Sequence, residues 1–552
     1  MFIIDKLNKK FEELSLIPLS GTDLNSDLIL IKCYFNMWSE INAWLEKSHL
    51  TGKVGTEFKI FGIGRDGDYD FSLVALTLIA KKWSNNLSQK AKNNLINNIL
   101  TQKGNNLLSE KWLFNLIPET ENHLILSNSS LYLTNEILFD SSGDKKYNNL
   151  TNGVHIWLFN YLKNIIKNGL YEYNAKPYSS WTIRALQNLY SYSNNKEIKT
   201  ISKILLDQLF FKFIIQSKNA NLVVPFRRRS DHLVDEIRVN DEYATWFLAL
   251  TGWIPDSEDM VVAKHDLIFV LTTMIQDYKP HNEFIQLAFN DKPIWSKCKH
   301  SNTEISYKEK NFALFSGGHE DRPYIIPTPE DGIVRETCLF LNDDSTKMSQ
   351  LIRFNSINGF WQTKNNTGVY KNFACGANII IPANFYIKKV LELNLAVYNF
   401  LETDNCYIVI KTLDNPINLT NTLKNVGCLE IVNKTEINSF EDFYNKVLEL
   451  NQTTKLTLTG NSSYNSIRGY QISFKCITNN KDWLISKVEK NGIIIEEGGN
   501  ASQTWQYLYV ETTDGICIAH SNIGGFSYSN DGFHYSSSFS EDIPQILNYK
   551  MT

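Results

Sequence analysis

The sequence lacks the segments by which membrane, secreted and nucleotide-binding proteins are usually recognised. No run approaches the roughly 18 apolar residues that a membrane-spanning helix needs. Residues 1–15 alternate charged and apolar side chains, where a secretory signal has an unbroken apolar region. No glycine-rich nucleotide loop, GxSxG elbow or HExxH motif is present. We therefore expect no membrane span and a cytoplasmic location by default, or a periplasmic or secreted one if a native signal was removed.

Positive charge and cysteine are also scarce. The 552 residues carry a formal net charge of −4, whereas nucleic-acid binders normally present a basic field, so we expect no nucleic-acid partner. The eight cysteines are scattered, with no CxxC pair and no Cys/His spacing of the kind that holds zinc. We expect neither a metal nor a redox cofactor. Aromatic residues are plentiful, with 26 Tyr and 12 Trp; such side chains line carbohydrate clefts but fill cores equally often.

The first half of the chain, from residue 25 to about residue 290, has the pattern of consecutive amphipathic helices. No residue-level repeat is visible. Helices joined by short loops stack as antiparallel pairs, which predicts either a solenoid or a closed toroid. Apolar residues recur at helical spacing in segments separated by polar loops: 28–45, 70–83, 90–100, 152–168, 181–193, 197–212, 243–251 and 263–278.

The character of the sequence changes near residue 290. From Asn311 on, β-branched and aromatic runs alternate with turn clusters, the runs including 312–315, 336–340, 407–411, 455–458 and 470–477. This pattern predicts an antiparallel β sandwich, with a helical insert at 438–451 and a linker at 279–306. The expected fold is therefore α+β and multidomain, with a helical domain over 1–290, a β-sandwich domain over 291–552 and a separate core in each.

Two short loops concentrate polar and ionisable residues beside helix-like sequence. The first, Pro118–His123, follows the helix-like segment 110–116, and the second, Tyr171–Tyr178, precedes the helix predicted at 181–193. Loops held between rigid helices are where helical scaffolds commonly present catalytic groups. Helix capping also explains either loop taken alone, because Asn is a favoured N-cap residue and Pro suits the first turn of a helix.

Taken together, the two loops resemble those of the alginate lyase and heparinase II/III group of polysaccharide lyases. In that group an Asn-His pair lies in one loop, and a catalytic Tyr lies some 55 residues later at the start of another helix. Asn122, His123 and Tyr178 reproduce the residue types and the spacing, since Tyr178 follows Asn122 by 56 residues. The resemblance covers the domain order of most of the chain, whereas the motif match is confined to these loops. Some relatives carry an Arg seven residues before the Tyr; here that position is Tyr171.

The resemblance implies a helical (α/α) toroid, a β-sandwich domain and cleavage of an acidic, uronate-containing glycan by β-elimination. Asn122 and His123 would hold the uronate carboxylate, and Tyr178 would transfer the proton. A His from the β domain would cover the cleft, with His319 as the first candidate and His534 as the second. Carbanion formation beside a carboxylate requires neutral or positive donors on the acid group. Tyr can act as base and then as acid if a nearby cation lowers its pKa from about 10.

The partner that this implies is an acidic polysaccharide or oligosaccharide substrate. Arg side chains bind carboxylate or sulfate groups through two parallel hydrogen bonds, and the only triple-arginine run lies in Pro225–His232. A solvated basic patch paired with nearby acidic residues is the alternative explanation of this run. We expect substrate contacts from the arginines and from the residues near the two loops: Glu121, Tyr171, Tyr173, Arg184, Arg227, Arg228, Arg229 and His232.

Two other function classes stay open. A glycoside hydrolase needs two carboxylates flanking the bond that it cleaves, which Glu119 with Glu121, or Asp68 with Asp70, can supply. A protein that binds an acidic glycan without cleaving it is the third class, favoured by Tyr171 in place of the Arg. The ultraviolet absorbance of an unsaturated product separates a lyase from a hydrolase. The particular glycan, the endo or exo mode, the oligomeric state and whether a metal lies in the β domain are left open.

Overall fold

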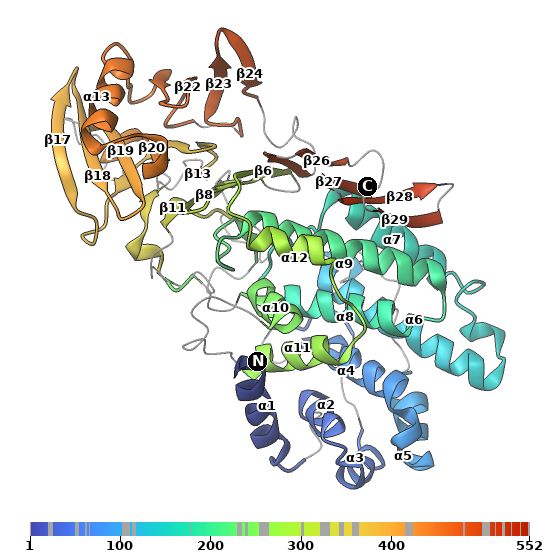
Figure 1. Cartoon of the computed structure of the whole chain (residues 1–552). Helices are drawn as coiled ribbons and strands as arrows, with labels where there is room; N and C mark the ends of the chain where they lie inside the picture. The colour runs from blue at the N-terminus through green and yellow to red at the C-terminus, as the bar shows by residue number, and fades with distance from the viewer. Residues whose placement is uncertain are drawn as a thin grey trace.

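The structure is a computed structural model in which helices occupy the N-terminal half and antiparallel sheets the C-terminal half (Figure 1). The expected α+β class, with helices before strands, is thereby confirmed. No helix in the described ranges combines the length and the apolar character that crossing a bilayer requires. The structure describes residues 2–19, 26–49, 54–60, 63–65, 67–101, 111–112, 117–176, 178–228, 235–237, 241–252, 264–299, 303–320, 332–341, 347–355, 364–414, 423–478, 481–499, 508–513, 515–520, 525–530, 533–540 and 543–549.

The helices of the N-terminal half largely follow the predicted pattern. The predictions at 70–83, 152–168, 181–193 and 197–212 are confirmed as α4, α7, α8 and α9, each to within four residues. Within the described residues the α-helices of this half are α1 (Phe2–Ser15), α2 (Ser26–Tyr34), α3 (Trp38–Leu45), α4 (Tyr69–Lys82), α5 (Gln89–Asn94), α6 (Glu121–Ser142), α7 (Val154–Asn168), α8 (Ser179–Tyr192), α9 (Lys196–Gln216), α10 (Glu242–Thr251), α11 (Lys264–Ile275) and α12 (Asn282–Ala288).

Two helical predictions are wrong. The segment 28–45 is divided into α2 and α3, because Asn36 between them has a left-handed backbone (φ 59°) that an α-helix cannot continue. The segment 110–116 contains a strand, Lys111–Trp112, which pairs with Ile117–Pro118. The remaining residues of that segment lie outside the described ranges.

Helix α6 is missing from the prediction for a physical reason. Nearly every residue from Glu121 to Glu136 is buried, so the helix has no polar face and shows no amphipathic period. Thr120 is its N-cap residue. Asn122 and His123 therefore lie in the first turn of a helix instead of in a loop.

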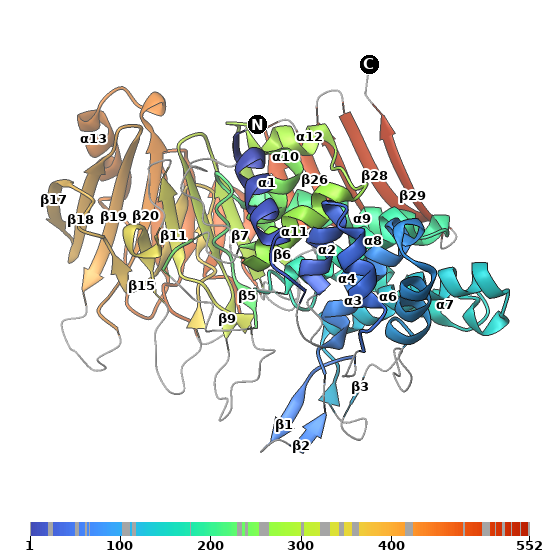
Figure 2. The ribbon, with the colours of Figure 1, turned by 90° about the horizontal axis from the view of Figure 1, so that it is seen from below.

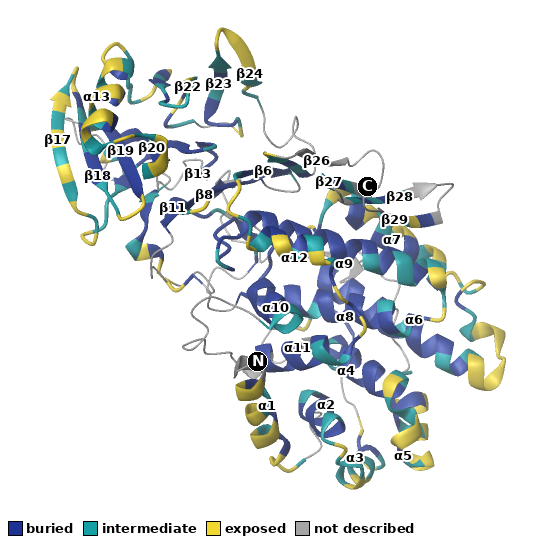
Figure 3. Ribbon diagram, viewed as in Figure 1, coloured by how far each residue is buried: buried dark blue, intermediate teal, exposed yellow. Residues whose placement is uncertain are grey.

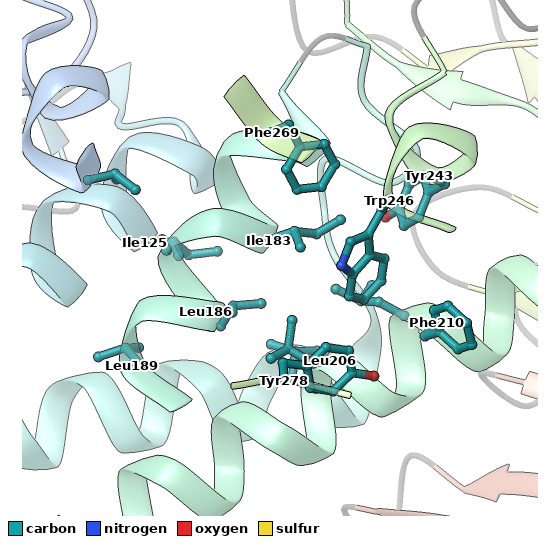
Figure 4. Packing of buried hydrophobic residues seen from close by; sticks show 14 of the residues in the cluster. Ile125, Ile183, Leu186, Leu189, Leu206, Phe210, Tyr243, Trp246, Phe269 and Tyr278 are labelled. Carbon is teal, nitrogen blue, oxygen red and sulfur yellow. The ribbon is translucent and has the colours of Figure 1, made fainter. Parts of the chain in front are cut away.

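The helices pack around a shared hydrophobic cluster. α4 contacts α6, α6 contacts α8, and α8 contacts α9 and α11, and these central helices are buried along most of their length (Figure 3). In Figure 4, Ile183 and Leu186 of α8 lie close to the aromatic side chains of neighbouring helices. Trp246 meets Phe210 edge-on at 5.6 Å and stacks on Tyr278 at 5.6 Å. Each large side chain buried in this way contributes about 1.5–3 kcal/mol.

The C-terminal half forms a large sheet and two smaller ones. Among the described residues the large sheet has eleven strands in the order β16-β12-β11-β8-β7-β6-β25-β26-β27-β28-β29. They are β6 (Ile294–Lys299), β7 (Thr303–Lys308), β8 (Phe312–Gly317), β11 (Thr337–Leu341), β12 (Ile352–Phe354), β16 (Ile379–Ile380), β25 (Leu508–Thr512), β26 (Gly515–His520), β27 (Gly525–Asn530), β28 (Phe533–Ser540) and β29 (Ile543–Tyr549).

The second sheet has the order β14-β15-β20-β19-β18-β17, and the third the order β21-β22-β23-β24. Their strands are β14 (Val369–Tyr370), β15 (Phe373–Ala377), β17 (Ile387–Leu393), β18 (Ala396–Glu402), β19 (Cys406–Asp414), β20 (Asn425–Asn433), β21 (Ser462–Asn465), β22 (Tyr470–Phe474), β23 (Ile485–Lys490) and β24 (Ile493–Glu497). Four strand pairs stand apart: β1 (Phe58–Ile60) with β2 (Ile63–Arg65), β3 (Lys111–Trp112) with β4 (Ile117–Pro118), β5 (Phe226–Arg227) with β10 (Gly332–Ile333), and β9 (His319–Glu320) with β13 (Lys364–Asn365). The predicted helical insert is confirmed as α13 (Phe440–Asn451).

The large sheet is covered on both faces, because its residues alternate between two hydrophobic clusters. On β8, Ala313 and Phe315 belong to the cluster of the helices, whereas Phe312 and Leu314 belong to the cluster that contains the second sheet. The strand β11 alternates in the same way. Since side chains alternate faces along a strand, the part of the large sheet that contains β8 and β11 lies between the helices and the second sheet (Figures 1 and 2).

Two expectations for this half are corrected. The predicted linker at 279–306 is wrong, because α12, β6 and part of β7 occupy it. The predicted strand at 455–458 is wrong as well, since that segment is not part of a strand. The described hydrophobic residues form two clusters, the first of which joins the helices to one face of the large sheet, and the expected separate cores stay a prediction. The boundary between 290 and 291 stays a prediction.

A buried carboxylate ties the last strands to the helices. Asp207 of α9 accepts hydrogen bonds from the hydroxyls of Tyr278 (3.1 Å) and of Tyr535 on β28 (3.0 Å). The ammonium of Lys203 donates to both carboxylate oxygens (2.8 and 2.7 Å). A carboxylate as buried as that of Asp207 is tolerated in the fold only when hydrogen-bond donors and an opposite charge surround it. Asp207 therefore fixes β28 against α9.

Replacing Asp207 with Ala should lower the free energy of unfolding by about 3–5 kcal/mol, because Lys203 and two tyrosine hydroxyls lose their partner. Chemical denaturation followed by circular dichroism measures the change. Asp140→Ala is the control, since exposed Asp140 only accepts a surface hydrogen bond from Asn194; its effect should stay below about 0.5 kcal/mol. Equal denaturation midpoints for the two variants would contradict the role of Asp207.

Candidate functional site

The two segments singled out by the sequence meet at neighbouring helix ends. The first leads into α6 and the second into α8, and these helices pack against each other. Hydrogen bonds between the segments, described below, bring the N-terminal ends of both helices together. The short strands β1, β2, β3, β5 and β9 lie on one side of the molecule (Figure 2).

The side chain of Asn122 is held by its oxygen, and its amide nitrogen is left unused. Thr120 Oγ1 (2.7 Å) and Arg228 Nη1 (3.3 Å) both donate to Asn122 Oδ1, which fixes the direction of the amide. The residue is 1% exposed, and Nδ2 has no hydrogen-bond partner among the described residues. A buried donor without an acceptor costs about 1–3 kcal/mol. An acceptor from outside the chain can reach this buried nitrogen only if neighbouring side chains move.

His123 lies between two carboxylates. Its Nδ1 is 2.7 Å from Asp70 Oδ2, and its Nε2 is 3.6 Å from Asp68 Oδ1. The amide of Gly55 donates to the other oxygen of Asp70 (3.0 Å) and fixes that carboxylate. Burial is the largest single influence and lowers the pKa of His123, but the charge and hydrogen bond of Asp70, together with the charges of Glu119 and Asp68, outweigh it, and the pKa is raised above its usual value. The ring is thus kept as a cation to higher pH.

The turn that presents these carboxylates depends on a close backbone contact. A Cβ atom at Gly67 would lie 2.3 Å from the backbone nitrogen of Glu57, so only glycine fits there. The next residue, Asp68, has a left-handed backbone (φ 63°), which Asp tolerates better than most residues. The amide of Asp68 donates to the carbonyl of Gly55 (2.8 Å) and closes the turn.

Arg228 joins the two segments and covers the ring of Tyr178. Its Nη1 donates to Glu172 Oε1 (2.7 Å) as well as to Asn122, and its guanidinium carbon lies 4.2 Å from the centre of the Tyr178 ring. Asn122 and Tyr178 therefore contact the same cation. Arg228 has a left-handed backbone (φ 65°), a strained conformation that often marks functional positions. Tyr178 is only partly buried.

Two buried glutamates bind the backbone of each other's segment. The carboxylate of Glu121 accepts from the amides of Tyr171 (3.1 Å) and Glu172 (2.9 Å), and the carboxylate of Glu172 accepts from the amide of Asn122 (3.0 Å). Burial, and secondarily the charge of Glu172, raises the pKa of Glu121 to about 8. These reciprocal contacts fix the first turn of α6 against 171–178.

An arginine lies next to position 171 although none is encoded there. The guanidinium of Arg227 stacks on the ring of Tyr171, 3.7 Å from its centre, and its Nη2 donates to the tyrosine hydroxyl (2.7 Å). Tyr171 is 45% exposed, so this pair lies at the surface, whereas Arg228 is buried. Both cations come from the predicted arginine run.

Two substrate-binding candidates point elsewhere. Arg184 is buried and pairs with Asp27 (3.2 Å), and its guanidinium lies over the ring of Trp181. The rings of Trp181 and Phe71 lie between it and His123. Tyr173 is 1% exposed and contributes its carbonyl, which accepts from the amide of Arg227 (3.0 Å).

The histidine candidates of the β half are only partly described. The backbone of His319 belongs to β9, while its side chain lies outside the described set. Gly317 at the end of β8 approaches Pro225, so β9 starts beside the arginine run. His534 Nδ1 is 2.6 Å from Ser529 Oγ in the β27–β28 hairpin. The predictions for Arg229 and His232 also fall outside the described residues.

Two residues organise the site in roles that were not predicted, since the sequence suggests Asp70 only as a hydrolase carboxylate and Glu172 only as part of the segment 171–178. Glu172 links Asn122 to Arg228, and Asp70 holds His123. A signal for each exists in the sequence, because both carboxylates stand among apolar or aromatic neighbours and such positions need a partner when buried. The sequence does not show which partner each has, because His123 is 53 residues from Asp70 and Arg228 is 56 residues from Glu172.

The sequence matches no protein-family model, and no curated protein is significantly similar to it. Within the described ranges, no three His, Cys, Asp or Glu side chains are grouped so as to hold a metal ion. The interpretation of the site therefore depends on its geometry and chemistry.

The raised pKa of Glu121 predicts a pH dependence of stability. The folded state favours the protonated carboxyl, so the contribution of Glu121 is complete below the unfolded pKa of about 4.3 and is lost as the pH rises towards 8. Between these values the free energy of unfolding of the wild type, relative to that of Glu121→Gln, should fall by up to about 1.4 kcal/mol per pH unit.

Denaturation of both proteins from pH 5 to pH 9 measures this difference, and the other titrating groups cancel in it. Glu441→Gln is the control, at an exposed position of α13, and should follow the wild type at every pH. Parallel curves for wild type and Glu121→Gln would show that Glu121 is ionised throughout.

Proposed function

We propose that the chain is a polysaccharide lyase that cleaves an acidic, uronate-containing glycan by β-elimination. The observation that carries the proposal is the amide N–H of Asn122, which is held in one orientation and has no acceptor among the described residues. His123 is the next residue in the chain, and the Arg228 guanidinium donates a hydrogen bond to the oxygen of the same amide. A neutral donor with cations nearby suits a carboxylate whose charge must be neutralised before a proton can leave the adjacent carbon.

In this mechanism the uronate carboxylate binds at Asn122 Nδ2, and His123 supplies the positive charge. Because Asn122 is buried, the carboxylate reaches it only when the surrounding side chains move. Tyr178, as a phenolate, removes the proton on C5, and the electron pair of that C–H bond forms the C4–C5 double bond. The C4–C5 double bond forms only as the C4–O bond breaks; until then the electron pair is delocalised into the bound carboxylate, and the oxygen leaves with the proton that Tyr178 had taken.

Arg228 keeps a positive charge against the Tyr178 ring through these steps. A neighbouring cation is the condition under which a tyrosine can serve as the base near neutral pH. The reciprocal contacts of Glu121 and Glu172 hold the acid-binding and proton-transferring residues at a constant separation. Arg227 and Tyr171, at the surface, would contact the flanking sugar units.

The finer description of the fold belongs to the same proposal. We infer that the consecutive packed helices close into an (α/α) toroid, as the resemblance implies. The two larger sheets, which share one hydrophobic cluster, would form the β sandwich. His319, whose strand starts beside the arginine run, remains the candidate that the β half contributes to the cleft.

A hydrolase receives less support, because the carboxylates that it needs already bind the protein itself. Asp70 is engaged by His123 and by a backbone amide, and Glu121 accepts two backbone amides. Glu119 accepts from the hydroxyl and amide of Thr56. A protein that binds the glycan without cleaving it would release no unsaturated product, and this difference alone distinguishes it from a lyase.

Wild-type protein screened against acidic glycans should release an unsaturated product that absorbs in the ultraviolet, and Tyr178→Phe should lower kcat by about 10²–10⁴-fold. The variant keeps the ring and its packing but cannot transfer a proton. Tyr190→Phe is the matched control: it lies at the other end of α8, is also partly buried, and should retain wild-type turnover. A fully active Tyr178→Phe protein would end the lyase assignment.

Asn122→Asp should reduce kcat/KM by at least about a hundredfold, because an anionic oxygen replaces the donor that faces the carboxylate. The substitution preserves the size of the side chain and an acceptor for Arg228 and Thr120, so the thermal midpoint should change little. Initial rates of the ultraviolet increase measure the effect. Wild-type rates in a correctly folded Asn122→Asp protein would exclude this residue from carboxylate binding.

A further inference from the structure

A small cavity lined by charged side chains lies behind the segment that carries Tyr178. It offers about 10 Å³ to the centre of a water-sized sphere, room for about one water molecule. Its lining includes Lys176, two residues before Tyr178, with Asp241 and Glu242 at the start of α10. Arg335, from the strand-rich half just before β11, completes the polar wall.

Three atoms of this wall have no hydrogen-bond partner among the described residues. They are Asp241 Oδ2, Glu242 Oε1 and Arg335 Nε, and their residues are 2%, 1% and 6% exposed. Each such group costs about 1–3 kcal/mol when left unpaired, and more when charged. Three of them around one cavity therefore indicate a missing partner.

The chemistry of the three atoms identifies that partner. Two carboxylate oxygens accept hydrogen bonds and one guanidinium N–H donates one, and a water molecule offers two O–H donors and free lone pairs. A buried water typically makes about three hydrogen bonds. A metal ion fits less well, because Lys176 and Arg335 bring two positive charges to the same wall.

The charges around the cavity also depend on one another. Burial lowers the pKa of Lys176 and raises the pKa of Glu242. The acidic side chains Asp241 and Glu242 oppose the first shift, and Lys176 opposes the second. An ammonium buried to this extent stays charged only with such neighbours.

We propose that this cavity binds one internal water molecule, which donates to Asp241 Oδ2 and Glu242 Oε1 and accepts from Arg335 Nε. The water completes a polar socket around Lys176. The socket fixes the backbone that leads into Tyr178, which makes Lys176 a positioning residue; only the consequence for turnover rests on the proposed lyase function. The same segment is held at Asn174, whose Nδ2 donates to Glu304 Oε1 of β7 (2.9 Å).

A crystal structure of the full chain at about 2 Å resolution or better tests the water directly. The expected result is a peak within about 3.2 Å of all three atoms. An empty cavity, or Arg335 Nε bonded directly to either carboxylate, would overturn the site.

Hydrogen exchange tests the positioning role without any assay of activity. Lys176→Met keeps most of the side-chain volume but removes the charge, and amide exchange in 171–178 should speed up at least tenfold while α13 stays unchanged. Lys90→Met, at an exposed lysine with a 3.4 Å ion pair, is the matched control and should leave 171–178 unaffected. Unchanged exchange in Lys176→Met would overturn the positioning role.

If Lys176→Met does not fold, Glu242→Gln replaces it, because this substitution keeps one acceptor for the water but removes a charge that favours the Lys176 ammonium. Amide exchange in 171–178 should then be faster than in the wild type. Exchange at the wild-type rate would count against the socket. With an active substrate, Lys176→Met should lower kcat while KM stays near the wild-type value. A water in place and faster exchange in a protein without lyase activity would refute the proposed function and leave this inference standing.

Discussion

The contacts of the Arg228 guanidinium hold the candidate site together. One side chain donates to Glu172 and to Asn122 and lies over the ring of Tyr178. Without that cation, Glu172 would be a buried carboxylate with no opposite charge within the described contacts, a situation that costs several kcal/mol. The amide of Asn122 would lose one of the two donors that fix its direction. The backbone strain at Arg228 is therefore offset by contacts that organise three chain segments.

The site is built before any ligand arrives. Glu121 and Glu172 lock two segments through backbone amides, Asp70 orients His123, and Asn174 is bonded to β7. Such fixed dipoles and charges need little reorganisation when charge develops during a reaction. This arrangement buries polar groups, and the contribution of Glu121 to the free energy of unfolding depends on pH.

The strand-rich half takes part in this arrangement. Its large sheet packs one face on the helices and the other on the second sheet, so the two halves share a hydrophobic cluster. Polar contacts follow the same junction, from Asp207 with Tyr535 to Glu304 with Asn174 and Lys212. The linker predicted at 279–306 is wrong, because α12, β6 and part of β7 occupy this range. The prolines in this range lie beside ordered elements and do not mark an extended linker.

The sequence by itself determined the helical first half and the strand-rich second half, because periodicity is a local property of a chain. The pairing of Asn122-His123 with Tyr178 came from the resemblance to a known family. The sequence could not reveal α6, since a helix buried on all sides has no amphipathic period. Only the tertiary structure decided the rest. Arg228 reaches Asn122 across 106 residues, and Glu172 reaches it across 50. The arginine absent at 171 is supplied by residue 227 from a separate strand. Contacts between segments so distant are set by the packing of whole helices, which no local pattern encodes.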